Sequence, residues 1–310
     1  MFIVKYRKIW YIFSGLLVLA SLFSVFYFGL KLGIDFTGGS LLEVEFNPPA
    51  GGAAGGRPEI SSLQKIVEGL GFGNVSLQPT GDNGLLVRLK NLNEEEHQKL
   101  LSALASTGSL NEIRFDSIGP VIGKELQRKS IYAIVMVVVM IILYIAFAFR
   151  KVSAGSPRGD RGVSSFKYGL MAVVALIHDV SLPTGVFAVL GKYFGVEIDI
   201  LFITAILTVL GFSVHDTIVV FDRIRENLKK DVGADFENTV GISLKQTIVR
   251  SINTSLTVLL VLFALFFFGG ESTKYFSLAL IIGVAIGTYS SIFLASPLLV
   301  TLYKFQNRKK

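Results

Sequence analysis

Cysteine is absent from this sequence, and charged residues make up only 17% of its 310 positions. The lack of cysteine excludes disulfide bonds, thiolate metal sites and a cysteine nucleophile, but it leaves the cellular compartment open. The shortage of charge has a larger consequence. Because 51% of the residues are hydrophobic, the chain carries more apolar surface than a soluble domain of this length buries. We therefore interpret the chain as a membrane protein.

Long uncharged runs predict six membrane-spanning helices. Residues 9–30 follow a basic start, as in a signal peptide, but this apolar run is too long and has no small-residue cleavage site near its end. We therefore interpret it as a retained span. The six predicted spans cover residues 9–30, 130–149, 168–190, 198–221, 248–268 and 276–303.

The distribution of lysine and arginine predicts the orientation of these spans. Eighteen of the 30 basic residues lie before the first span, between the second and third, between the fourth and fifth, or at the C-terminal end. The short loops on the other side contain only Lys192 and Lys274. The positive-inside rule then places both termini in the cytoplasm and residues 31–129 outside it. Topology thus accounts for the net charge of +7, and we do not expect a nucleic-acid partner.

The exported segment, residues 31–129, has a readable order of strands and helices. Strands are predicted at 41–46, 74–79, 85–89 and 110–119, and helices at 58–70 and 93–104. This βαββαβ order predicts a ferredoxin-like α+β domain. The expected architecture is therefore an α-helical membrane protein with a first transmembrane helix in residues 1–30, an extracytoplasmic domain in 31–129, and five further helices with cytoplasmic connectors in 130–310.

Nothing in the exported segment indicates catalysis, and we expect no enzyme activity, cofactor or metal. The run at residues 48–58 predicts a flexible Gly/Ala loop that is too apolar for a charged ligand and lacks the context of a phosphate-binding loop. His97 lies among glutamates on a predicted helix, which indicates a solvated position.

Two acidic residues lie inside predicted spans, where a carboxylate costs about 3 kcal/mol on insertion scales. Asp216 lies in the fourth span, with Ser213 and Thr217 on or near its helix face. Asp179 lies halfway along the third span, four residues before Pro183, which cannot donate to the Asp179 carbonyl. Intramembrane acids normally face a cavity or a partner, so both are candidates for proton coupling. The alternatives are static pairing for Asp216 and, for Asp179, satisfaction of backbone groups freed by the proline.

The fifth span carries polar residues at spacings of three and four, which place them along one helix face. Lipid does not solvate such a stripe, so we expect it to face the bundle or a partner. Arg250 would there be available to an acid such as Asp216. The alternative is that Arg250 only extends to the cytoplasmic headgroups. The polar stripe consists of Gln246, Arg250, Asn253, Thr254 and Thr257.

The sixth span carries small residues at four-residue intervals, which permit close helix packing within the chain or against another chain. This small-residue ridge consists of Gly283, Gly287, Ser291 and Ala295. Residues 222–250, between the fourth and fifth spans, predict a cytoplasmic connector with a short helix along the headgroups and a solvated charged face.

Several stretches resemble a known family. GIDFTGGS, from Gly33 to Ser40, resembles the signature of the SecD and SecF protein-export subunits. ALIHDV, FSVHDTIVVFDRIREN, QTIVRSINTSLT and IGTYSSIFLASPLL resemble the SecF branch of that family. The resemblance covers nearly the whole chain, strongly in the membrane half and loosely in residues 46–115. It implies a six-helix member of the resistance-nodulation-division superfamily.

The resemblance also implies a function and partners. A SecF-like subunit would work with SecD, the SecYEG channel and YajC, contact membrane lipids and a translocating unfolded polypeptide, and use the proton-motive force to complete translocation on the outer face of the membrane. The family's proton-linked acid falls on Asp216 and its fifth-span arginine on Arg250. His215 stands where many relatives have asparagine, and it would either tune the neighbouring carboxylate or fill the same space.

The GIDFTGGS junction would connect the first span to the exported domain. Its glycines, Gly33, Gly38 and Gly39, flank Asp35 and give the backbone freedom, and a second glycine-bearing connection follows at residues 119–123. These features predict a domain that swings on two tethers when protons bind. Two other classes stay open: a half-transporter for small molecules, disfavoured by the compact exported domain, and an assembly scaffold without a proton role, which leaves the polar stripe unexplained.

Overall fold

The computed structural model describes residues 2–47, 57–148 and 165–307, which form two compact units. The membrane unit combines Met1–Lys31 with Tyr132–Lys310, and the inserted unit is Leu32–Ile131. Most of the predicted Gly/Ala loop at 48–58 and most of the basic segment at 150–167 lie outside the described residues.

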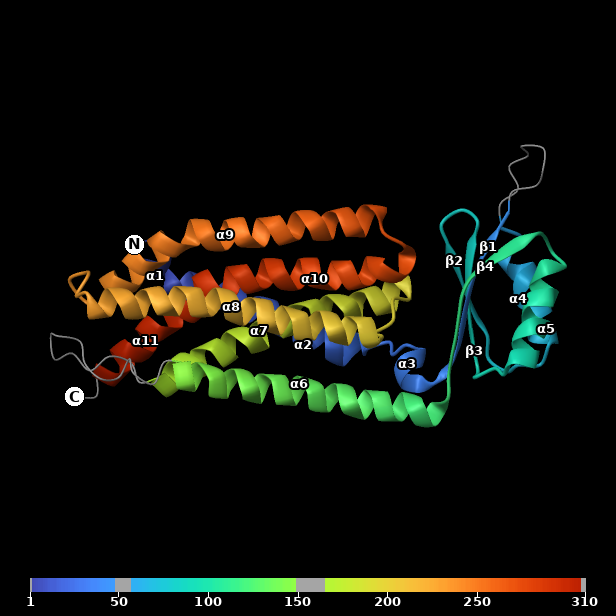
Figure 1. The fold of residues 1–310 in the computed structure, drawn as a ribbon, viewed down its shortest axis with the longest axis horizontal. Coiled ribbons are helices and arrows are strands. Elements are labelled where there is room, and N and C mark those ends of the chain that lie inside the picture. Colours follow the sequence, from blue (N-terminus) through green and yellow to red (C-terminus); the bar gives the residue numbers. More distant parts are fainter. Residues whose placement is uncertain (1, 48–56, 149–164, 308–310) are drawn as a thin grey trace. The chain divides into compact units, whose positions relative to one another are not determined.

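Six helices in the described residues are long and apolar enough to cross a membrane, as the sequence predicts (Figure 1). The sixth span is interrupted by a π-helical turn. The helices of this part of the chain are α1 (Phe2–Lys5), α2 (Arg7–Phe28), α6 (Pro120–Ala148), α7 (Ser165–Phe194), α8 (Ile200–Lys229), α9 (Phe236–Phe268) and α10 (Glu271–Ser290), followed by the π turn η2 (Ser291–Ala295) and α11 (Ser296–Asn307).

The segment between α8 and α9 is shorter than predicted. Helix α8 continues to Lys229 and α9 already begins at Phe236, so most of the predicted connector at 222–250 is helical. The chain turns because Asp231 and Gly233 adopt φ values of 55° and 102°, which no helix tolerates. The Asp235 side chain then accepts a hydrogen bond from a backbone N–H in the first turn of α9 and caps that helix. The prediction of a separate connector along the headgroups is therefore wrong.

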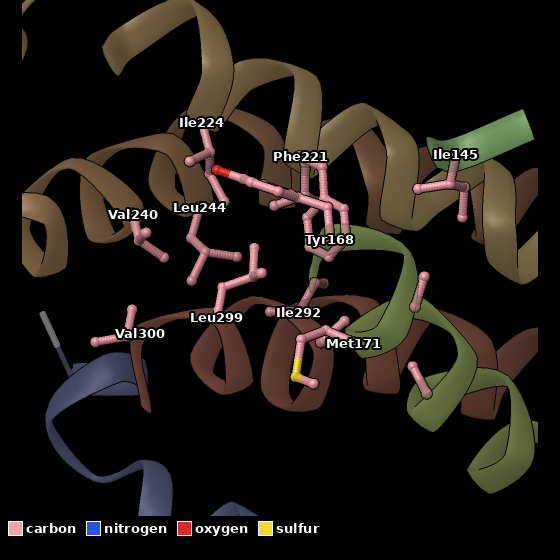
Figure 2. Packing of buried hydrophobic residues seen from close by; sticks show 14 of the residues in the cluster. Ile145, Tyr168, Met171, Phe221, Ile224, Val240, Leu244, Ile292, Leu299 and Val300 are labelled. Carbon is pink, nitrogen blue, oxygen red and sulfur yellow. The ribbon is translucent and has the colours of Figure 1, made fainter. Parts of the chain in front are cut away.

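The inner helices of the membrane unit are α7, α8 and the sixth span. At least half of their apolar stretches is buried, whereas α2, α6 and α9 bury much less. Figure 2 shows the cluster where α7, α8, α9 and the sixth span meet, with the ring of Tyr168 lying edge-on to Phe221 at a centroid distance of 5.2 Å. Leu244 and Leu299 pack into the same cluster. The outer helices therefore leave most of their apolar surface exposed on the single chain.

The small-residue ridge of α10 packs against α8 of the same chain. A Cβ atom on Gly283 would lie 2.1 Å from Cγ2 of Val209, and one on Gly287 would lie 3.0 Å from Cβ of Ser213. Ser291 is buried in η2, and its hydroxyl donates to a carbonyl of the preceding turn at 3.0 Å. The two glycines therefore permit the close approach of α8 and α10.

Ion pairs join the two ends of the chain at one end of the bundle. Arg7 Nη1 donates to Oε1 of Glu237 at 2.7 Å, and Lys304 pairs with Oε2 of the same residue. The start of α2, the start of α9 and the end of α11 therefore lie together at one end of the bundle (Figure 1). Six spans, an even number, would return the chain to the side of the membrane on which it began, in agreement with this arrangement.

The inserted unit has the predicted βαββαβ order and forms an antiparallel sheet with strand order β2-β3-β1-β4. Helices α4 and α5 cover one face of the sheet (Figure 1). Alternate residues of β1 and β3, such as Leu42 and Val87, pack on Leu63 and Leu100 of the helices. The elements are α3 (Ile34–Thr37), β1 (Gly39–Phe46), α4 (Ile60–Gly69), β2 (Ser76–Thr80), β3 (Gly84–Leu89), α5 (Glu94–Ala105) and β4 (Leu110–Ile118).

His97 on α5 is not solvated, contrary to the prediction. Only 5% of the residue is exposed, and its ring stacks on Phe115 with centroids 3.7 Å apart. Its ring nitrogens lie 3.5 Å from Oε2 of Glu94 and 3.3 Å from Oε1 of Glu112. Phe115 and Glu112 come from β4, so the periodicity of the helix alone does not reveal this burial.

Gly38 and Gly39 of the GIDFTGGS junction are tightly packed. Gly38 and Gly39 adopt φ values of 76° and 138°, which favour glycine. A Cβ atom on Gly38 would lie 2.7 Å from Cα of Pro120, and one on Gly123 would lie 2.9 Å from the Gly38 nitrogen. The two connections therefore pack against each other, where the sequence predicts separate loose tethers.

We predict that Gly283→Ala destabilises the membrane unit, because the added Cβ overlaps Val209 and overpacking costs about 1–3 kcal/mol. The matched control is Gly211→Ala on α8, where a Cβ would meet nothing within 4 Å. Thermal unfolding of the detergent-solubilised protein should show a lower midpoint for Gly283→Ala only. Equal midpoints for the two variants would mean that the ridge is not tightly packed.

Candidate functional site

Polar side chains gather in the interior of the membrane unit, between α7, α8, α9 and α10. Most of them are serines and threonines, whose small size allows the helices to approach. Two are carboxylates, Asp179 on α7 and Asp216 on α8. The buried polar residues of this region are His178, Asp179, Ser213, Asp216, Thr217, Ser251, Ser255, Thr288, Ser290 and Ser291.

Asp179 is fully buried and has hydrogen-bond donors from three helices. Its Oδ1 lies 2.9 Å from Nδ1 of His178, and Ser290 of α10 donates to its Oδ2 at 2.7 Å. Ser213 of α8 donates to the same Oδ2 in a short hydrogen bond. Helix α7 continues through Pro183, which lies four residues further on. The carboxylate therefore links α7 to both α8 and α10.

Asp216 is also buried, but its carboxylate is less well satisfied. The residue is 2% exposed, and the hydroxyls of Ser251, Ser255 and Thr288 approach its carboxylate from α9 and α10. Oδ2 makes no hydrogen bond of normal geometry with any residue that the structure describes. A buried carboxylate oxygen without a donor is costly when ionised. It is therefore a position where binding a proton removes an unfavourable charge.

The other residues around Asp216 on α8 lie as helical geometry requires. Thr217 is 2% exposed and Ser213 is 1% exposed, so both belong to the buried face with the acid. His215 is exposed, on a different side of the helix from the Asp216 carboxylate. The histidine side chain thus does not enter the polar interior.

The predicted polar stripe of α9 lies on the outer surface of the chain. Arg250 and Asn253 are exposed, next to exposed apolar residues such as Val249. Thr254 and Thr257 donate to carbonyls of their own helix at 2.9 and 2.7 Å. No ion pair joins Arg250 to Asp216 within the described part of the chain, so the expected contact between them is not made here.

Gln246, the first residue of the stripe, is tied to α8. Its Oε1 accepts hydrogen bonds from Nε of Arg223 at 2.7 Å and from Nδ2 of Asn227 at 2.8 Å. Asn227 Nδ2 also lies 2.8 Å from Oγ of Ser243. These contacts fasten the end of α8 to the start of α9, while the rest of the stripe has no such attachment to the bundle in the described part of the chain.

A second stripe on α9, which sequence reasoning missed, faces the bundle. It consists of Ser243, Thr247, Ser251 and Ser255, at intervals of four residues, and all four are buried. Ser255 Oγ is hydrogen-bonded to Oγ1 of Thr288 on α10. The four-residue spacing of small hydroxyl residues could have indicated this inner face, but the larger polar residues of the outer stripe gave the stronger signal.

Among the interior residues, the side chains of His178, Ser213 and Ser290 contact Asp179. The sequence placed Ser213 near Asp216 but gave no reason to connect it with Asp179. Ser290 lies 111 positions from Asp179, and this distance in the chain hides their contact. Within the described residues, no three histidine, cysteine or acidic side chains come together to hold a metal ion.

Comparison with known proteins agrees with this architecture. The family model described as protein export membrane protein SecD/SecF, C-terminal, matches residues 98–157 and 163–305, and the SecD/SecF GG motif matches residues 23–50. Protein translocase subunit SecF of Thermobaculum terrenum is 46% identical over 304 residues, covering 96% of this chain and 93% of the relative. The SecF subunit of a Synechocystis strain is 37% identical over 314 residues, covering 98% and 95%.

A solved structure is similar over the whole fold. The crystal structure of SecDF from Thermus thermophilus, named as a translocon-associated membrane protein, has a TM-score of 0.80 and 31% identity. The match covers 97% of this chain but only 38% of the SecDF chain. This chain thus corresponds to one part of a longer protein in that organism.

We predict that Asp179→Ala destabilises the bundle more than Asp216→Ala. Removing Asp179 takes the acceptor from buried groups of His178 and Ser213, and leaving buried donors unpaired costs on the order of 2 kcal/mol or more. Asp216 has an oxygen without a hydrogen-bond partner in the described structure, so its removal should cost less. Thermal unfolding midpoints in detergent should follow this order, and the reverse order would contradict the assignment of Asp179 as the better satisfied acid.

Proposed function

The chain belongs to the SecD/SecF family of protein export membrane proteins, as a SecF subunit of the protein translocase, and we propose that it works with SecD to convert the proton-motive force into late translocation of polypeptides across the cytoplasmic membrane. Asp216 binds and releases the coupling proton, and Asp179 is a second acid of the same polar interior. The observation that carries the proposal is the buried Asp216 carboxylate, whose Oδ2 has no hydrogen-bond partner among the described residues.

The energy available from a proton is sufficient for a conformational change. One charge that crosses about 150 mV of membrane potential releases roughly 3.5 kcal/mol. A two-state bundle shifts its populations several hundred-fold with such an energy, since each 1.4 kcal/mol is about a factor of ten. Asp216 lies where α8 meets α9 and α10, so a change in its charge acts on the contacts between these three helices.

Arg250 has its role at the surface of the chain. An arginine on a lipid-facing surface in the membrane costs about 3 kcal/mol or more, and Asn253 and Thr257 extend the same exposed stripe. A partner helix with an acidic or polar face would remove this cost. We assign that place to SecD, with the arginine paired to an acid of the partner in at least one state of the cycle.

The orientation and the other partners follow from the same proposal. Both termini, joined through Glu237, lie in the cytoplasm of a bacterial cell, and the inserted unit lies outside the cytoplasmic membrane. There it would meet the polypeptide that emerges from the SecYEG channel, with YajC as a further component. The glycines of the GIDFTGGS junction would pass helix movement to this domain through their packed contacts with Pro120 and Gly123.

We predict that Asp216→Asn abolishes the proton-gradient stimulation of export while insertion and assembly stay normal, because the amide keeps the size of the side chain but does not ionise. Export into inverted membrane vesicles with and without a proton gradient measures this effect. The matched control is Asp222→Asn on the same helix, where the carboxylate pairs with Arg225 at its exposed end. Stimulation of Asp216→Asn vesicles equal to that of wild type would refute the assignment.

For Arg250 we predict that Arg250→Leu stops proton-driven export and that Arg250→Lys retains part of it, because only lysine keeps a charge for the partner. The control variant is Lys245→Leu, which removes the same charge from an exposed position of the same helix. A topological role alone would make the two leucine variants equivalent. In that case the pH profile of export with Arg250→Leu would overlay that with Lys245→Leu, and the proposed contact would be discarded.

A further inference from the structure

The surroundings of Asp179 contain a second acid-base group that the proposed function does not use. His178 is 3% exposed, and its Nδ1 lies 2.9 Å from Asp179 Oδ1. Its Nε2 is buried and has no hydrogen-bond partner among the described residues. With its ring hydrogen on Nδ1, His178 donates to Oδ1 and has no buried N–H at Nε2 that would lack an acceptor.

With Oδ1 occupied by His178, an added proton has its place on Oδ2. This oxygen accepts hydrogen bonds from two hydroxyls, Ser213 and Ser290. If Oδ2 takes a proton, one of these hydroxyls has to turn its own hydrogen elsewhere and accept the new one. The two serines differ in whether they have another acceptor within reach.

Only Ser290 has such an alternative in the described part of the structure. Its Oγ lies 2.7 Å from Asp179 Oδ2 and 3.1 Å from the carbonyl oxygen of Gly287 on its own helix. A hydroxyl has one hydrogen and donates to one acceptor at a time. The Ser213 hydroxyl has Asp179 as its hydrogen-bond acceptor and no second one among the residues that the structure describes.

We propose that Ser290 is the positioning residue through which protonation of Asp179 changes the conformation of the sixth span. In the ionised state, Ser290 donates to Oδ2 and ties α10 to α7 by a charge-assisted hydrogen bond. When Oδ2 gains one proton, the new O–H donates to Ser290 Oγ, and the serine hydrogen turns to the Gly287 carbonyl. One proton is taken up and no other covalent bond changes. This inference rests on the proposed function of the membrane unit as a proton-driven device.

The change matters because of its position beside the π turn. A hydrogen bond to a charged group is about twice as strong as one between neutral groups, so protonation weakens the tie between α7 and α10. The π turn η2 begins at the next residue, Ser291. A π turn interrupts the regular α-helix, is one of the features at which helices kink, and often occurs at functional sites. The sixth span should therefore change its bend at η2 when the tie weakens.

The titratable groups near Asp179 are few. On α7 there is His178, and on α10 there is Tyr289, whose ring lies 6.0 Å from the His178 ring and whose hydroxyl is 3.1 Å from Oγ of Ser14 on α2. On α8 the nearest is Asp216, three residues after Ser213. No lysine or arginine pairs with Asp179 in the described residues. Protonation of Asp179 itself is therefore the change of charge that alters its hydrogen bond with Ser290.

The test is a distance measurement across η2 in the full chain, assembled with SecD in proteoliposomes. Because the chain has no cysteine, Ala285→Cys and Phe305→Cys can carry two spin labels at exposed positions on either side of the π turn. Twenty helical residues separate the labels by roughly 30 Å, within the range of pulsed electron resonance. We expect the distance distribution to shift between mildly alkaline and mildly acidic buffer.

Variants in the labelled protein identify the source of the shift. Asp179→Asn, which mimics the neutral acid, should hold the acidic distribution at every pH, and Ser290→Ala should abolish the response. The matched control is Ser277→Ala, a fully buried serine of α10 that donates only to its own helix, and it should respond as wild type. The inference is overturned if wild type shows no shift, or if Ser290→Ala shifts as Ser277→Ala does.

One more variant keeps this inference separate from the proposed function. Asp216→Asn in the labelled protein should keep the pH-dependent shift, because it leaves the contact between Asp179 and Ser290 intact. Loss of the shift in this variant would assign the response to Asp216 and refute the role of Ser290. If Asp216→Asn keeps both the shift and full proton-driven export, the proposed function fails while the Ser290 contact stands.

Discussion

A carboxylate inside a membrane bundle has to be satisfied by protein groups, because lipid supplies no hydrogen bonds. This requirement explains the composition of the inner helices. Serines on α8 and α10 reach Asp179, and serines on α9 approach Asp216. Such contacts need helices that lie close together, which Gly283 permits where α10 crosses α8. The polar interior and the small-residue ridge are therefore two parts of one arrangement.

The two acids differ in how completely this requirement is met. Asp179 has donors from three helices and holds them together, whereas Asp216 has one oxygen without a hydrogen-bond partner in the described parts of the chain. Helix α9 has two polar faces, one toward the bundle and one away from it. Its inner face brings Ser251 and Ser255 to Asp216, and its outer face carries Arg250 away from the bundle. In the proposed function, the inner face of α9 serves the proton site and its outer face contacts a partner.

The sequence predicted the six spans, the βαββαβ order and the two intramembrane acids, because hydrophobic runs, strand alternation and a charge within an apolar run are local signals. It did not predict features that depend on residues far apart in the chain. His97 was expected in solvent because its partners Phe115 and Glu112 lie on another element. Similarly, periodicity assigned polar residues to one face of α9 but did not determine whether that face pointed inward, and nothing local indicated the contact of Ser290 with Asp179.

The central claim is that Asp216 gains and loses a proton as the complex works. Infrared difference spectroscopy of the complex with SecD in oriented membranes measures this directly, because a protonated carboxyl group absorbs at its own frequency. A band from a protonated carboxyl should appear when the outer side is acidified, disappear when the gradient is collapsed, and be missing in Asp216→Asn. A band that is unchanged by that substitution, or a carboxylate of Asp216 that stays ionised throughout, would contradict the account.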